Sequence, residues 1–102
     1  MSVTAPLSKP IKAHGDEVFE LTFREPAVKD RNELGIPFLF VQSNDGGTGT
    51  EVRQFVISRY ISRLASIPMT SVEALSMSDF DLCMATILGF FGKGDSEVTK
   101  TS

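Results

Sequence analysis

The chain has 102 residues, the size of one domain, and 41% of them are hydrophobic, a composition that excludes disorder throughout. Its 13 acidic and 10 basic side chains give a net charge of −3, which disfavours a surface built to neutralise nucleic-acid phosphates. A single cysteine, Cys83, excludes an internal disulfide, and no apolar stretch approaches the ~20 residues that span a bilayer, so we expect a cytoplasmic protein without membrane contact.

The N-terminal part of the chain is predicted to form a β-hairpin. A first strand covers residues 7–12, and Pro10, which has no N–H to donate, places it at a sheet edge. Gly15 adopts a positive φ at low cost and indicates the turn. In the second strand, residues 18–24, apolar and polar side chains alternate, so three side chains are expected on one face: Phe19, Leu21 and Phe23.

The middle of the chain predicts a short helix and then an apolar run. Residues 27–34 have a helical composition, and Gly35 is suited to end that helix. The apolar run 36–41 contains Pro37 and fits either an extended core segment or an exposed docking surface. Residues 43–50 are rich in glycine and small polar residues, which predicts a flexible loop.

The second half predicts two main helices with a short one between them. Apolar residues recur at helical spacing over 51–66, and Pro68 ends this helix. A short helical turn follows, begun by Thr70 or Ser71 and extending to Leu75. The last helix is expected to be capped by Ser78 and to end at the glycines 92 and 94.

These elements predict a single α+β domain over residues 7–92, with flexible tails at 1–6 and 93–102. An N-terminal β-hairpin is followed by a small helical bundle of two main helices plus short helical turns.

A search for catalytic chemistry favours a non-enzymatic protein with no cofactor and no metal. His14 is the only histidine and lies in the hairpin turn without an orienting partner. Cys83 falls on the apolar face of the last helix, where it acts as a small hydrophobic residue. Asp79 and Asp81 lie two residues apart and point to different sides of that helix, so they are interpreted as stabilising its N-terminus.

The remaining feature is apolar surface, since excess exposed apolar area marks protein-binding sites. The candidate binding residues come from the apolar run and from the faces of the two main helices. They are Ile36, Phe38, Phe40, Phe55, Tyr60, Leu64, Phe80, Ile87, Phe90 and Phe91. The same surface is expected to permit self-association into a homo-oligomer.

An ordered set of short motifs resembles a known family. The set includes Glu20-Leu21-Thr22-Phe23-Arg24-Glu25-Pro26, Leu34-Gly35-Ile36-Pro37-Phe38 and Tyr60-Ile61-Ser62-Arg63-Leu64-Ala65. In this order, over residues 7–91, the motifs are similar to those of tail assembly chaperones from P2-like and Mu-like contractile-tailed bacteriophages.

The resemblance implies a protein of the host cytoplasm that binds the tape measure protein, assists tail tube assembly and is absent from the mature virion. It also implies that the chain is the short product of a translational frameshift, with the longer product as a partner, and Gly92-Lys93 is compatible with slippery codons. The alternatives are a minor structural protein of the tail and a small DNA-binding or regulatory protein. The net charge, together with a connection over 67–77 that is too long for a helix-turn-helix, argues against nucleic acid.

Overall fold

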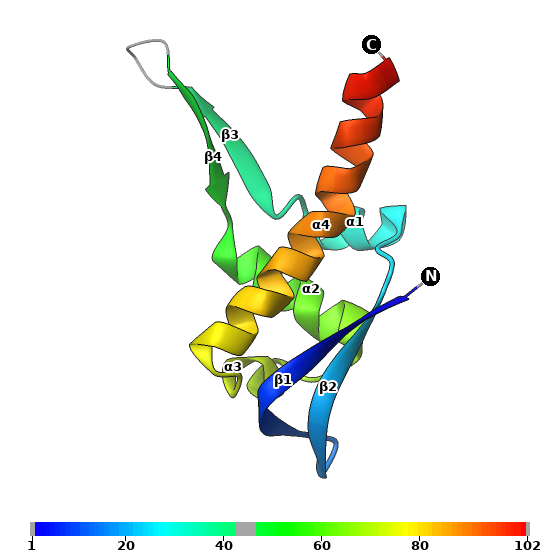
Figure 1. Ribbon diagram of the computed structural model, residues 1–102, viewed down its shortest axis with the longest axis vertical. Coiled ribbons are helices and arrows are strands. Elements are labelled where there is room, and N and C mark those ends of the chain that lie inside the picture. Colours follow the sequence, from blue (N-terminus) through cyan, green and yellow to red (C-terminus); the bar gives the residue numbers. More distant parts are fainter. Residues whose placement is uncertain (1, 43–46, 102) are drawn as a thin grey trace.

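A computed structural model of the chain describes the backbone of residues 2–42 and 47–101, and the side chains of these residues except 40–42, 48, 50 and 92–101. The α+β prediction is confirmed, because an N-terminal antiparallel hairpin precedes the helices (Figure 1). The elements are β1 (Ser2–Ala13), β2 (Asp16–Arg24), α1 (Val28–Leu34), β3 (Phe38–Gln42), β4 (Thr48–Val52), α2 (Gln54–Ala65), α3 (Met69–Glu73) and α4 (Met77–Thr101).

The first hairpin, β1–β2, has the turn that the sequence predicts. His14 and Gly15 both have positive φ, 55° and 84°, as a two-residue hairpin turn requires. β1 begins at Ser2 instead of the predicted residue 7, because Ser2–Pro6 continue the pairing with β2. Ala5, opposite Leu21, is buried with it in the core, which explains why this segment is not a loose tail.

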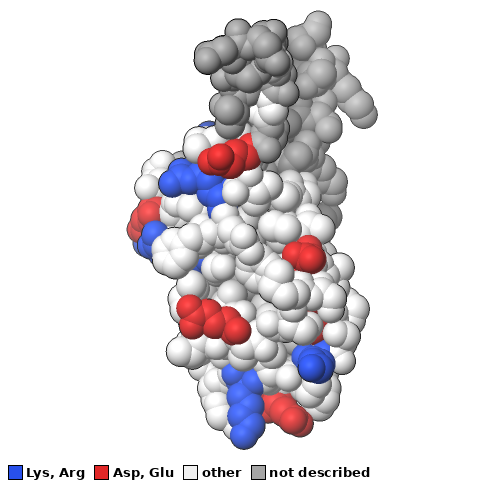
Figure 2. Space-filling model, turned by 90° about the vertical axis from the view of Figure 1, so that its left-hand side faces the viewer, with Lys and Arg blue, Asp and Glu red and all other residues white. Residues whose placement is uncertain are grey.

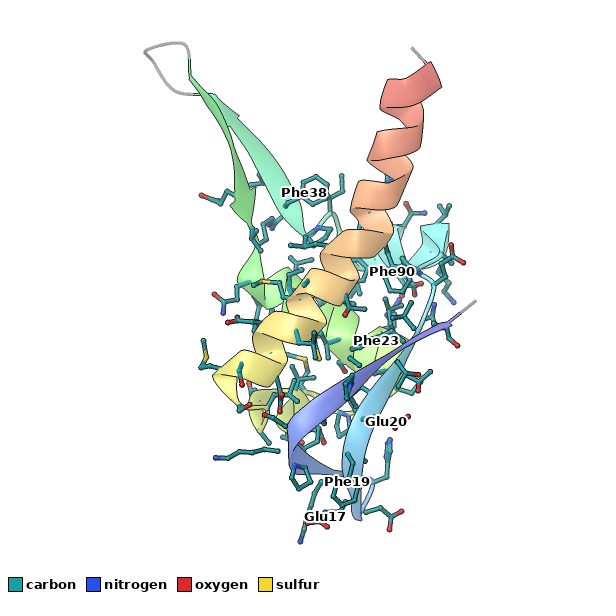
Figure 3. All side chains as sticks on the ribbon, viewed as in Figure 1. Glu17, Phe19, Glu20, Phe23, Phe38 and Phe90 are labelled. Atoms are coloured by element: carbon teal, nitrogen blue, oxygen red, sulfur yellow. The ribbon has the colours of Figure 1, made fainter. Side chains whose placement is uncertain are left out.

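Phe19 faces the opposite way from the prediction. The pairing of β1 with β2 is regular on either side of a shift between Pro6 and Ile11. On one side of this irregularity Val18 faces the core, and on the other side Leu21 and Phe23 face it. Phe19 lies between them and is 61% exposed, while Phe23 is fully buried (Figure 3). The extra residues of β1 therefore remove Phe19 from the core.

The core lies where α2 and α4 cover the inner face of the first hairpin (Figure 1). The helical spacing in α2 buries one stripe of side chains against the hairpin and α4. That stripe consists of Val56, Ile57, Tyr60, Ile61 and Leu64.

A second hairpin, β3–β4, includes residues 48–50 of the predicted loop and residues 51–52 of the predicted helix. Among the described residues it is a separate two-stranded sheet, with Phe38 opposite Val52. Residues 43–46 of the predicted loop lie outside the described residues. α2 consequently begins at Gln54, since the residues before it pair with β3.

The boundaries of the helices differ from the predictions at several ends. Gly35, at φ 88°, ends α1 as predicted, and its N–H donates to the carbonyl of Arg31. α4 is capped by Ser76 instead of Ser78, because the Ser76 hydroxyl accepts the N–H of Asp79 at 3.3 Å. The helix continues to Thr101, past the glycines at which it was expected to end. A glycine costs about 1 kcal/mol inside a helix, which weakens a helix without ending it.

Among the described residues, none of the helices has both the length and the apolar character needed to cross a bilayer.

Candidate protein-binding surface

Several large apolar side chains are exposed, and they come from most parts of the fold. They are Val3, Phe19, Val28, Ile36, Leu39, Val52, Phe55, Met77 and Leu82. On the side of the molecule shown in Figure 2, charged groups are scattered and broad uncharged areas separate them. The protein thus offers apolar contact area, and the question is which of the predicted residues supply it.

Four of the predicted binding residues belong to the core. Tyr60 and Ile87 have no exposed surface, and Leu64 and Phe80 are at most 8% exposed. The Tyr60 hydroxyl donates to the carbonyl of Gly35, and burial raises its pKa above the usual value. These side chains hold the helices together and are not accessible to a partner in this conformation.

Three predicted aromatic residues, Phe38, Phe90 and Phe91, are half-buried, and two of them, Phe38 and Phe91, join the second hairpin to the core. Phe91 contacts Phe38 edge to face with ring centroids 6.3 Å apart, and it contacts Tyr60 in the same way at 5.4 Å. Phe90, which belongs to α4, packs against the core as well, and Figure 3 shows Phe38 near the same helix. Their first role is therefore to complete the core.

Two predicted residues are exposed, Ile36 and Phe55. The side chain of Phe40 lies outside the described residues. The sequence missed Leu39, Val52 and Met77, each of which is exposed. Successive side chains of a strand point to opposite faces, so Leu39 points away from the face that carries Phe38. Reading residues 38–42 as a strand would therefore have predicted that Leu39 is exposed.

The exposed Phe55 lies in the first turn of α2, and other residues of this helix line two hollows. One hollow, of about 230 Å³, is lined by Leu34, Arg59, Ser62, Arg63 and Met69. The other, of about 160 Å³, lies between α2, α3 and the start of α4 and is lined by Gln54, Ser58, Val72, Glu73, Leu75, Met77 and Phe80. Exposed apolar side chains beside concave surface are what a protein-binding site requires.

A buried carboxylate, Asp30, positions an arginine at the larger hollow. Asp30 accepts two hydrogen bonds from Arg24, at 2.8 and 3.0 Å, and one from the N–H of Ala27 at 2.7 Å. Arg63 contacts it at 3.4 Å and also pairs with Glu33. The Arg24 guanidinium holds the pKa of this carboxyl well below its usual range. The cluster joins the end of β2 to α1 and α2.

Asp79 lies in the first turn of α4, as the predicted role at the helix N-terminus requires, and it has a second role as well. Its carboxylate is buried and accepts the N–H groups of Ser8, at 2.9 Å, and Lys9, at 3.1 Å. These bonds fall in the irregular part of β1, and chiefly that to Ser8 lowers the pKa of Asp79. Asp79 therefore stabilises the strand irregularity that turns Phe19 outward.

His14 and Cys83, two candidates for chemistry in the sequence, both have structural surroundings. The His14 ring is hydrogen-bonded to the Ser66 carbonyl at 2.9 Å, and burial raises the pKa of the Cys83 thiol to about 11. Among the described residues, no three His, Cys, Asp or Glu side chains gather where they would hold a metal ion.

One protein-family model matches most of the chain. Residues 4–92 match the family described as "Phage tail assembly chaperone proteins, E, or 41 or 14". The chain belongs to this family. No curated protein and no solved structure matches it. The resemblance found in the short motifs of the sequence is thereby confirmed at the level of the family.

Proposed function

We propose that this tail assembly chaperone binds the tape measure protein in the host cytoplasm, assists assembly of the tail tube and is absent from the mature virion. The family match over residues 4–92 is the observation that carries the proposal. We also infer that the protein acts without enzymatic chemistry, since chaperoning requires binding alone.

The physical basis of the proposal is that binding to the chaperone competes with aggregation for the apolar surface of the client. A protein that binds an aggregation-prone chain lowers its free concentration and so lowers its aggregation. Ile36, Leu39 and Val52 near the second hairpin, and Phe55 on α2, supply exposed apolar contacts for such a chain. The longer frameshift product and the tail tube protein are further proposed partners, and a homo-oligomer remains a proposal for the free protein.

Co-expression with the tape measure protein of the same phage tests the proposal. We expect the tape measure protein to shift to the soluble fraction and to copurify with the chaperone. Tape measure protein that remains insoluble and fails to copurify with either frameshift product would contradict tape measure binding.

Two further measurements address the remaining parts. Mass spectrometry of purified virions is expected to lack this chain, and finding it in stoichiometric amount would instead identify a structural tail protein. The nucleotide sequence should contain a slippery heptamer near codons 90–94, and its absence would remove the frameshift.

A further inference from the structure

The outer face of α2 combines an exposed aromatic ring, positive charge and a hollow. We define it as Phe55, Arg59 and the 230 Å³ hollow beyond them. Phe55 is 68% exposed and lies on the side of the helix opposite the buried stripe that contains Tyr60 and Leu64. A phenylalanine in this position adds nothing to the core, so its contact area is available to a partner.

This face is basic although the whole chain is acidic. Residues 52–72 contain three arginines and no acidic residue, against a net charge of −3 for the chain. Arg63 is paired with Glu33 and Asp30. Among the described residues, Arg53 and Arg59 have no carboxylate within ion-pair distance, not even that of the neighbouring Glu51. Arg59 lies one turn after Phe55 on the same face of α2, whereas Arg53 lies at the N-cap, where the helix begins.

The hollow continues the face along the helix. Ser62 lies two turns after Phe55, about 10 Å away at 1.5 Å per residue, and Arg59 lies between them. Two of the lining side chains, Leu34 and Met69, are apolar, and Arg59 brings positive charge, whereas the charge of Arg63 is matched by Glu33 and Asp30. Apolar surface and the charge of Arg59 thus lie together on this face.

We propose that the outer face of α2 binds an acidic amphipathic helix of the client protein. Apolar side chains at positions i and i+7 of that helix would contact Phe55 and enter the hollow. A carboxylate between them would pair with Arg59, and a carboxylate beyond position i would pair with Arg53 at the start of α2. Arginine forms two parallel hydrogen bonds with a carboxylate, which favours a carboxylate over other acceptors. The identity of the client rests on the proposed function, whereas the chemistry of the bound helix rests on the α2 face itself.

A synthetic peptide tests the chemistry without the phage client. The probe is a fluorescein-labelled amphipathic helix with leucines on one face and glutamates beside them, and its control replaces each glutamate with lysine. We expect the wild-type protein to bind the glutamate peptide in fluorescence anisotropy and to bind the lysine peptide at least about tenfold more weakly, since tenfold corresponds to only about 1.4 kcal/mol.

Matched variants locate the site on the protein. Phe55→Ser and Arg59→Glu are expected to weaken binding of the glutamate peptide about tenfold or more, as loss of a central contact does. Their controls are Phe19→Ser, which removes an aromatic ring of similar exposure from the first hairpin, and Lys29→Glu, which reverses an exposed charge on α1. Both controls should bind as the wild type does, and circular dichroism should show all four variants folded.

Distinct outcomes separate this inference from the proposed function. Equal binding of the glutamate peptide by the test and control variants, or no binding by the wild type, overturns the inference. Displacement of the glutamate peptide by single-stranded RNA at an equal concentration of charge would also overturn it, because the face would then recognise phosphate. Failure of the tape measure protein to copurify, with the peptide results as expected, contradicts the proposed client and leaves the α2 site standing.

Discussion

Both hairpins of this protein are two-stranded antiparallel sheets, but their surroundings differ. β1–β2 buries its inner face, including Ala5, Ile11, Leu21 and Phe23, beneath α2 and α4. β3–β4 leaves Leu39 and Val52 exposed and extends away from the body of the molecule in Figure 1. A two-stranded hairpin alone is marginally stable in water, so its neighbours decide how firmly it is held.

The two hairpins also differ in the contacts that join them to the helices. The first is joined to the helices by Asp79, by the His14–Ser66 bond and by the Ser71 hydroxyl, which donates to the Lys12 carbonyl at 2.6 Å. The second is joined by the Phe38–Phe91 ring contact and by the Arg53 N–H, which donates to the Pro37 carbonyl at 2.8 Å. The first hairpin is therefore part of the core, whereas the second is an exposed element attached to the core.

The largest effect should come from removing an aromatic ring in each hairpin. Phe23→Ala is expected to cost about 3–5 kcal/mol of unfolding free energy, because the ring is fully buried and leaves a cavity. Phe38→Ala should cost clearly less, since its ring is half-buried. Urea unfolding followed by circular dichroism measures both. Equal losses of unfolding free energy would show that the second hairpin belongs to the core as much as the first does.

Acid should loosen the first hairpin selectively. The pKa values of Asp30 and Asp79 are lowered, mainly by hydrogen bonds from Arg24 and from the Ser8 N–H respectively. In the unfolded chain these groups titrate near pH 4, so the unfolded state binds more protons below that pH. The stability that they contribute is therefore present above about pH 4 and is lost as the pH falls towards their folded pKa values.

Two isosteric variants measure this pH dependence. Asp30→Asn and Asp79→Asn should each be less stable than the wild type at pH 7 and should lose less stability on acidification to pH 3. Thermal unfolding across that range gives the values, and amide exchange of β1 and β2 shows where opening occurs. A wild-type slope that both variants retain would assign the acid sensitivity to other groups.

A smaller effect is expected at the turn of the first hairpin. His14→Ala should cost about 1 kcal/mol, the typical contribution of one hydrogen bond, because the bond to the Ser66 carbonyl is lost. His14→Gly serves as the control, since glycine also lacks the bond and suits the φ of 55° better. Unfolding midpoints should rank the wild type first, glycine second and alanine third. A glycine variant as unstable as the alanine variant would show that backbone conformation contributes little here.

The smallest effect concerns the junction between the second hairpin and α2. Arg53 occupies the N-cap without a side-chain hydrogen bond to the helix, a position that serine fills better. Arg53→Ser should raise the unfolding free energy by about 0.5–1 kcal/mol while weakening binding of the acidic peptide. Stabilisation without any loss of binding would remove Arg53 from the proposed site and leave Phe55 and Arg59.

The sequence by itself determined the local features that short-range chemistry controls. Gly15 predicted the first turn and Gly35 the end of α1, because each has a positive φ that other residues adopt at a cost. The apolar spacing around Ile57 and Ile61 predicted α2, and the motif order indicated the family that the match over 4–92 confirms. Of the predicted binding residues, Ile36 and Phe55 are exposed as a partner would require.

Only the tertiary structure decided which faces are covered. Phe19 points outward because Asp79, far along the chain, stabilises the irregular stretch at Ser8 and Lys9, and no local pattern encodes that contact. Spacing alone identified Tyr60 and Phe55 as apolar residues of one helix, whereas the hairpin and α4 bury the first and leave the second exposed. Periodicity specifies an apolar face, but the elements that pack against it decide whether that face becomes core or binding surface.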